Sequence, residues 1–337
     1  MHLKTFLTVI ILLDLFALRL IAQASPTGTR DTKEKKETHK QFGENADVRR
    51  RLEPPTSQSN RLPELEILIR ENKLGEAEVI AQNLLAQSPE DPLLLLWAGY
   101  LQFQQKQYSN AIPLLRAAEK RKPDLPDLAK YLSVCYYALT QYALFENEIQ
   151  EAIRLSPTDP ELHYFEGLYK YSVEDDLASA LASFDRALEL RPLDQQALYH
   201  RGRTYEILGE NQKAREDYSK AIELIETRGT EGFSLPYQGM ASLLLESSLK
   251  EALQYVLKSV KIEPESDSGY FLLGKIYSQL GNLPEAIAAF ERVAKLNPTS
   301  GRTHYCLYLL YLRAGNRNAA EAALAEFQRR NEFYGKK

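Results

Sequence analysis

The chain has 337 residues, of which 44% are hydrophobic and 26% are charged, with 16 glycines and 16 prolines. These proportions are typical of a folded protein and exclude collagen-like and low-complexity chains. The formal net charge of −4 provides no basic field for binding phosphates, so we expect no nucleic-acid partner.

The N-terminal segment has the pattern of an export signal. Lys4 is followed by an apolar run over residues 5–13, and an A-x-A tripeptide ends at Ala24. Asp14 and Arg19 are unfavourable within an apolar segment, so a retained membrane anchor and a soluble leader are alternatives. We predict an exported protein, periplasmic or secreted, that is cleaved near Ala24, with a membrane-anchored form as the alternative.

The next segment, residues 25–57, is polar, carries both charge signs and closes with Pro54 and Pro55. Such a segment buries too little apolar surface to offset the entropy lost on ordering. We therefore expect three parts: a signal peptide or anchor over 1–24, a disordered charged linker over 25–57, and a folded array over 58–334.

Prolines recur through the array with a nearly constant spacing. Steps of 34 or 35 residues separate neighbouring members of this series: Pro89, Pro123, Pro157 and Pro192, then Pro264 and Pro298. A fixed period of this size is typical of a helical solenoid. The spacing predicts eight repeats, over residues 58–91, 92–125, 126–159, 160–194, 195–228, 233–266, 267–300 and 301–334.

The seventh repeat carries the most complete motif. Its characteristic residues are Tyr270, Leu273, Gly274, Tyr277, Ala286, Phe290 and Pro298. This series resembles the tetratricopeptide repeat (TPR) pattern W-x₂-L-G-x₂-Y…A-x₃-F…P, with Tyr in place of the opening Trp. The resemblance extends over residues 58–334 and implies an all-α, right-handed superhelical solenoid of helix-turn-helix repeats.

Small residues mark where paired helices are expected to approach each other. On the first helices these are Gly99, Ser133, Gly167, Gly202 and Gly274. The same place holds Leu65, Met240 or Tyr308 in three other repeats. We expect Gly209, Gly281 and Gly315 to adopt left-handed conformations in the turns between paired helices. The last helix should present part of its apolar face, including Leu324 and Phe327, without a following repeat.

Aromatic residues recur at places that the TPR family turns toward its concave groove. The fifth place of successive repeats holds Tyr164, Tyr199, Tyr237, Phe271 and Tyr305, and further inward places hold Tyr100, Phe103, Tyr137 and Tyr171. Because aromatic rings offer a large contact area at little entropic cost, we predict that these nine residues bind a peptide or helix of a partner protein. The alternative is that some of them complete the hairpin core.

The groove bases do not match the TPR domains that clamp the acidic tails of chaperones. Lys130, Arg203 and Lys275 are the groove-facing bases, and they lie too many repeats apart to form one clamp. We therefore expect no chaperone-tail binding.

Motifs for phosphate, dinucleotide or common zinc sites do not occur in the sequence. We predict a chain that is not an enzyme, with no cofactor and no metal. The acidic turn over 174–176 is expected to be solvated, and the histidines and the two cysteines to be structural. The predicted function is an exported protein-interaction scaffold. Alternatives are a structural array that self-associates through its ends, with a weak homo-oligomer through the C-terminal end, and a non-catalytic subunit of an envelope enzyme complex.

Overall fold

The structure is a computed structural model that describes residues 52, 54–55, 62–228 and 232–335. The predicted signal segment and nearly all of the predicted linker lie outside the described residues. The chain forms two compact units, an N-terminal unit that ends at Pro192 and a C-terminal unit that contains Leu193–Lys337. Within the described part, the elements are α-helices and one π-helical segment, with no strand, which confirms the all-α expectation.

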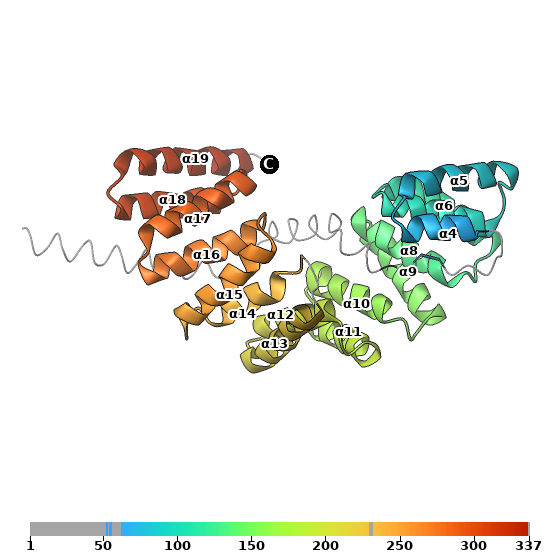
Figure 1. Ribbon diagram of the computed structural model, residues 1–337, viewed down its shortest axis with the longest axis horizontal. Helices are drawn as coiled ribbons and strands as arrows, with labels where there is room; N and C mark the ends of the chain where they lie inside the picture. The colour runs from blue at the N-terminus through green and yellow to red at the C-terminus, as the bar shows by residue number, and fades with distance from the viewer. Residues whose placement is uncertain (1–51, 53, 56–61, 229–231, 336–337) are drawn as a thin grey trace, which may run out of the picture. The chain divides into compact units, whose positions relative to one another are not determined.

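In its described residues, the N-terminal unit contains four helix pairs, each joined by a short turn (Figure 1). The pairs are α4 (Pro63–Arg70) with α5 (Leu74–Gln87), α6 (Pro92–Gln104) with α7 (Tyr108–Arg121), α8 (Pro126–Ala138) with α9 (Tyr142–Leu155), and α10 (Pro160–Tyr169) with α11 (Leu177–Leu190). A π-helical segment, η1 (Lys170–Glu174), lengthens the first helix of the last pair.

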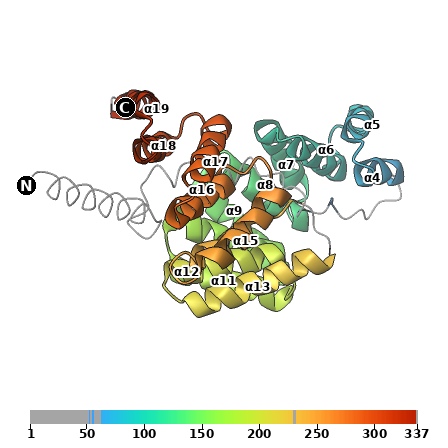
Figure 2. The ribbon, with the colours of Figure 1, turned by 60° about the vertical axis from the view of Figure 1, so that its left-hand side comes forward.

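The described part of the C-terminal unit also contains four pairs. They are α12 (Gln195–Ile207) with α13 (Asn211–Arg228), α14 (Leu235–Leu243) with α15 (Leu249–Ile262), α16 (Asp267–Leu280) with α17 (Leu283–Leu296), and α18 (Gly301–Arg313) with α19 (Arg317–Gly335). Partners such as α18 and α19 lie side by side in both views (Figures 1 and 2). Among the described helices, none combines the length and apolar character needed to cross a membrane.

First helices begin with a side-chain cap in several repeats. The Asp91 carboxylate accepts a hydrogen bond from the backbone N–H of Leu93 at 2.9 Å, and Pro92 follows directly as the first helical residue. Aspartate satisfies an N–H group that a helix start leaves without a partner, and proline has no N–H to satisfy. This pairing explains why the first helix of the repeat begins where it does.

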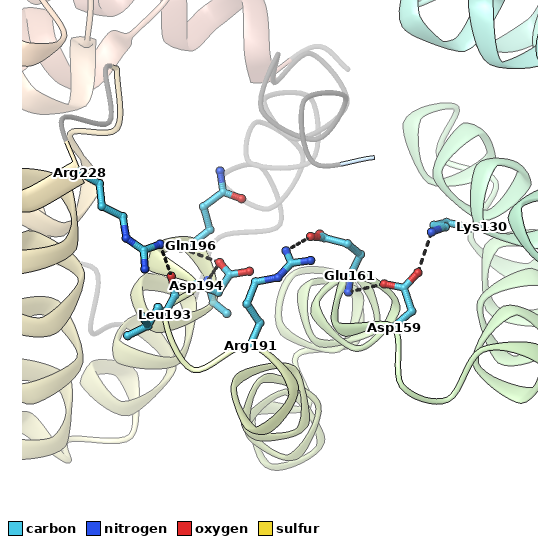
Figure 3. A network of polar contacts seen from close by, with 9 residues as sticks. Lys130, Asp159, Glu161, Arg191, Leu193, Asp194, Gln196 and Arg228 are labelled. Atoms are coloured by element: carbon cyan, nitrogen blue, oxygen red, sulfur yellow. Dashed lines mark hydrogen bonds and ion pairs between the residues drawn. The ribbon is translucent and has the colours of Figure 1, made fainter. Parts of the chain in front are cut away.

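The cap of α10 also joins neighbouring repeats within the N-terminal unit (Figure 3). Asp159 accepts from the backbone N–H of Glu161 at 3.0 Å and from Lys130 Nζ of the preceding repeat at 2.7 Å. Arg191, at the end of the same repeat, forms an ion pair with Glu161. These contacts connect groups about one repeat apart in the sequence and set the register of stacked repeats.

The C-terminal unit has a corresponding cap (Figure 3). Asp194 accepts from the backbone N–H groups of Gln196 and Ala197, both at 3.0 Å. Arg228, at the end of α13, donates to the carbonyl oxygen of Leu193 at 3.5 Å. The two ends of this repeat are thereby linked at the start of α12.

A left-handed residue forms the turn in most pairs. Gly209, Gly281 and Gly315 have φ angles of 77°, 81° and 73°, as predicted. In the N-terminal unit the same conformation is adopted by other residues, namely Asn72, Lys106, Thr140 and Asp175, with φ angles of 58°, 63°, 59° and 61°. Since a side chain at positive φ is strained, the four turns of this unit carry a cost that the glycine turns avoid.

Small first-helix residues contact large second-helix residues. A Cβ atom built on Gly99 would lie 2.7 Å from Leu115, and one on Gly274 would lie 2.7 Å from the Phe290 ring. The sixth repeat inverts this pairing: Met240 takes the glycine place and the smaller Val256 takes the place opposite, both within one buried cluster. The larger side chain on the first helix is thus compensated by a smaller one on the second helix, so this departure from the motif is tolerated.

Tyr218 of α13 is packed between two glycines. A Cβ atom on Gly202 of α12 would lie 2.8 Å from the Tyr218 ring, and one on Gly239 of α14 would lie 2.5 Å from it. The ring has no exposed surface. One side chain thus requires glycine on both the preceding and the following first helix.

Candidate protein-interaction surface

The predicted groove aromatics of the N-terminal unit are buried. Their exposed fractions lie between 0% and 8% for Tyr100, Phe103, Tyr137, Tyr164 and Tyr171. Phe103, for example, packs against the rings of Tyr108 and Tyr131 with centroid separations of 5.8 Å. The expectation that these rings form an open binding wall is therefore corrected: they belong to the core, where burying a large aromatic surface stabilises the stack.

Tyr237 in the C-terminal unit requires the same correction. Its exposed fraction is 2%, and its hydroxyl donates to Glu226 at 3.2 Å. Burial and the neighbouring Glu226 carboxylate raise the pKa of this phenol to about 12. Because the ring is enclosed and its hydroxyl is paired, Tyr237 contributes to folding in this structure and is not an open contact surface.

Three of the predicted aromatics, Tyr199, Phe271 and Tyr305, remain partly exposed. They belong to the first helices α12, α16 and α18 of the C-terminal unit. Each rests on another ring: Phe271 lies 5.2 Å from Phe290 and Tyr305 lies 5.1 Å from Phe327, measured between centroids. Neighbouring rings hold these side chains in place while part of each surface faces solvent.

The predicted groove bases are in different electrostatic environments. Lys130 lies 2.7 Å from Asp159. Burial acts to lower the pKa of Lys130, but the charge and hydrogen bond of Asp159, together with the nearby charges of Asp127 and Glu161, outweigh burial and raise it. Arg203 pairs with Glu206 at 2.6 Å. Lys275 has an exposed fraction of only 5%, and its pKa is lowered. The first two bases are therefore paired with carboxylates within the fold, and the pKa of Lys275 shifts in the opposite direction to that of Lys130.

Lys275, Arg302 and Phe271 form what we call the cationic cluster. Burial, followed by the nearby charge of Arg302, lowers the pKa of Lys275. The Arg302 guanidinium carbon lies 4.4 Å from the centre of the Phe271 ring, within the range of a cation–π interaction. The pKa of the adjacent Cys306 thiol is raised to about 11 by burial, although both cations act in the opposite direction. Sequence reasoning missed Arg302, which stands one helical turn before Tyr305 on α18.

Glu206 joins three helices of the C-terminal unit. Its carboxylate accepts hydrogen bonds from the Tyr218 hydroxyl at 2.6 Å and from Ser242 at 3.1 Å, in addition to the ion pair with Arg203. These donors come from α13, α14 and α12. Glu206 therefore holds α12, α13 and α14 together, and Arg203 pairs with it on α12.

The three histidines that the structure describes make structural contacts. A ring nitrogen of His163, Nε2, lies 2.9 Å from the carbonyl oxygen of Pro157, and His200 lies edge-to-face on Tyr199 with centroids 4.9 Å apart. The pKa of His304 is lowered by burial and by the nearby Arg330. These contacts agree with the structural role expected for histidine.

The acidic turn of the fourth repeat also has structural contacts. Glu174 pairs with Lys170 at 2.8 Å, and Asp176 caps α11 by accepting from the backbone N–H of Ser179 at 3.0 Å. In the part of the chain that the structure describes, no group of three or more His, Cys, Asp or Glu residues is arranged to hold a metal ion.

Sequence profiles for tetratricopeptide repeats match residues 66–126, 102–168, 166–227 and 268–300, which together make up more than half of the chain. The chain belongs to the tetratricopeptide repeat family. The helix pairs, the small first-helix residues and the turns described above are thus those of TPR repeats. A search of curated protein sequences gave no match.

Solved TPR structures show the same fold. A chain of the APC/C hetero-tetramer Cut9–Hcn1 has a TM-score of 0.60 and 14% identity, covering 80% of this chain and 54% of that one. A tetratricopeptide repeat protein from Parabacteroides merdae has a TM-score of 0.56 and 18% identity, covering 74% and 96%. PilF of Pseudomonas aeruginosa has a TM-score of 0.55 and 14% identity, covering 63% and 97%. At these identities the similarity concerns the fold alone.

The last TPR repeat presents apolar side chains that other repeats cover. The residues equivalent to Leu324 are at most 1% exposed: Ala81, Leu115, Ile149, Phe184, Tyr218, Val256 and Phe290. Leu324 itself is half-buried, as is Phe327 one turn further along α19. Part of the apolar face of α19 is therefore exposed in the described residues.

Proposed function

We propose that this TPR protein is an exported, non-catalytic scaffold that binds a peptide or helix of a partner protein through the first helices of its C-terminal unit. The observation that carries the proposal is the position of Tyr199, Phe271 and Tyr305, which remain partly exposed on those helices while the other predicted aromatics are buried. Anchored aromatic rings are frequent binding hot spots because they lose little entropy on contact.

Site-specific photocrosslinking tests this surface. A photoreactive phenylalanine analogue is introduced at Phe271 or at Tyr305 of the full chain, and at Leu257 as the control. Leu257 is 42% exposed but lies on α15, a second helix. We expect the same partner band from positions 271 and 305 and none from position 257. Equal crosslinking at all three positions would contradict a binding surface on the first helices.

Export is the second part of the proposal. It is supported by the basic residue, apolar run and A-x-A tripeptide of the N-terminal segment. We expect the mature chain to begin at Ser25 and to appear in the periplasmic or secreted fraction. N-terminal sequencing of the protein from each cell fraction decides this. A chain that keeps Met1 and fractionates with membranes would support the anchored alternative, and an intact chain in the cytoplasm would refute export.

Weak self-association through the C-terminal end is a second candidate function. It is supported by the partial exposure of Leu324 and Phe327, at a place that is buried in the other repeats. Apolar surface of this kind favours contact with another protein or a second copy. Sedimentation over a range of concentrations, with the parent chain and with Leu324→Glu, tests this candidate. A mass that does not change with concentration would exclude it.

A further inference from the structure

Ile67 of the first repeat is exposed at a place that most other repeats bury. It lies five residues before Asn72, whose φ angle is positive, as Ile276 lies five residues before Gly281. The exposed fraction of Ile67 is 53%, against 0% for Ile276. The remaining residues at this place are Leu101, Cys135, Tyr169, Thr204 and Leu310, each at most 6% exposed, and Ser242, which is partly exposed.

Inside the chain, this place packs with the second helix of the preceding repeat. Val256 on α15 and Ile276 on α16 belong to one buried cluster, and Phe290 on α17 and Leu310 on α18 belong to another. Val256 and Phe290 are equivalent to Leu324, which is half-buried on α19. Both halves of this apolar pair are thus also present in an accessible form, one on the first repeat and one on the last.

We propose that the last repeat of one copy binds the first repeat of a second copy, with Leu324 packed against Ile67 of the second copy. This inference rests on the self-association candidate above and names the surface that the second copy contributes. The contact continues the repeat interface of the chain from one copy to the next. Because it joins two different surfaces, each pair of copies keeps one surface of each kind for further copies.

The charges of the two terminal repeats favour this pairing over a contact between two last repeats. The first helix pair, residues 63–87, contains five acidic and two basic residues. The last helix pair, residues 301–335, contains three acidic and five basic residues. A first repeat and a last repeat therefore attract each other, whereas two last repeats in contact would bring like net charges together.

Self-association of two altered full chains tests the inference. Ile67→Glu changes the surface of the first repeat, and Leu324→Glu changes that of the last. Val79→Glu is the matched control, because Val79 is 58% exposed on α5 at a place that is exposed in the other repeats too. A buried carboxylate without a partner is costly, so each of the first two changes should weaken self-association by about tenfold or more. The control should associate as the parent does in sedimentation over a range of concentrations.

The decisive sample is an equimolar mixture of Ile67→Glu and Leu324→Glu. Each variant keeps one intact surface, so the mixture should form a heterodimer that does not grow further with concentration. If Ile67→Glu self-associates like the parent while Leu324→Glu does not, this inference is refuted and the self-association candidate stands. If the parent does not self-associate at any concentration tested, both are refuted.

Disulfide trapping is a second measurement that adds no charge to α19. Ile67→Cys copies are mixed under mild oxidation with Leu324→Cys copies that carry a size tag, while the native Cys135 and Cys306 are buried. We expect a mixed disulfide dimer in several-fold higher yield than with Val79→Cys in place of Ile67→Cys, since a disulfide requires the two Cβ atoms to be close together. Equal yields would contradict the proposed contact.

Discussion

Gly239→Ala should destabilise the C-terminal unit, although alanine is the better helix former. The new methyl group would lie 2.5 Å, 2.7 Å and 2.8 Å from three atoms of the Tyr218 ring. The ring cannot retreat easily, because Gly202 lies against it from α12 and the Tyr218 hydroxyl donates to Glu206 at 2.6 Å. The substitution therefore forces α13 and α14 apart or breaks the hydrogen bond of Tyr218.

The size of the effect follows from two opposing contributions. Adding a methyl group to a closely packed core costs about 1–3 kcal/mol. Replacing glycine by alanine inside a helix gains roughly 0.5–1 kcal/mol. We expect a net loss of about 1–2 kcal/mol in the free energy of unfolding of the C-terminal unit.

The control is Gly75→Ala in α5, where a Cβ atom would meet no atom within 4 Å. This change should stabilise its own unit by roughly 0.5–1 kcal/mol, through helix propensity alone. Hydrogen exchange is the suitable assay, because repeat arrays open locally and exchange assigns the loss to α12–α14. A second test uses Tyr218→Leu, because the second repeat has a leucine, Leu115, at the equivalent place. In that background Gly239→Ala should cost less. The packing argument fails if Gly239→Ala stabilises as Gly75→Ala does.

Three further predictions concern residues that the structure describes. Thr140→Gly should raise stability by about 1 kcal/mol, because Thr140 has a φ angle of 59° in a turn, whereas Gly281→Ala should lower it by a similar amount; chemical denaturation of both variants checks this. The pKa of Lys275 in the folded chain is lower than its ordinary value of 10.5, so the unfolded chain binds the proton of this group more tightly. The contribution of Lys275 to stability therefore rises as the pH increases from its folded pKa toward 10.5. Lys275→Met should therefore be more stable at neutral pH, and denaturation at several pH values should show the dependence reduced. Tyr237→Ala should cost about 3 kcal/mol of stability, since this ring is 2% exposed, while Tyr199→Ala should cost clearly less; equal losses in their melting curves would contradict the burial difference.

The sequence predicts the candidate surface only in part. Among the residues at the fifth place of each repeat, Tyr199, Phe271 and Tyr305 are partly exposed. It did not separate them from Tyr164 and Tyr237, whose exposed fractions are 3% and 2%. The repeat period predicts which face of its helix a residue lies on. Whether its ring is then buried depends on the volumes of neighbouring side chains, which differ between repeats.

The sequence by itself determined the repeat architecture, because period, small residues and helix-ending residues act locally. The periodic prolines follow the ends of second helices, the turn glycines end first helices, and the glycines inside first helices imply a close second helix. Gly209, Gly281 and Gly315 accordingly adopt the predicted turn conformation.

Only the tertiary structure decided which charges and rings are accessible. The hydrogen bond of Tyr218 to Glu206, the enclosure of Tyr218 between Gly202 and Gly239, and the contact of Arg302 with Phe271 each join different helices. Their partners are up to about one repeat apart in the sequence. Burial and electrostatic pairing depend on distances in space, and these exist only once the helices have stacked.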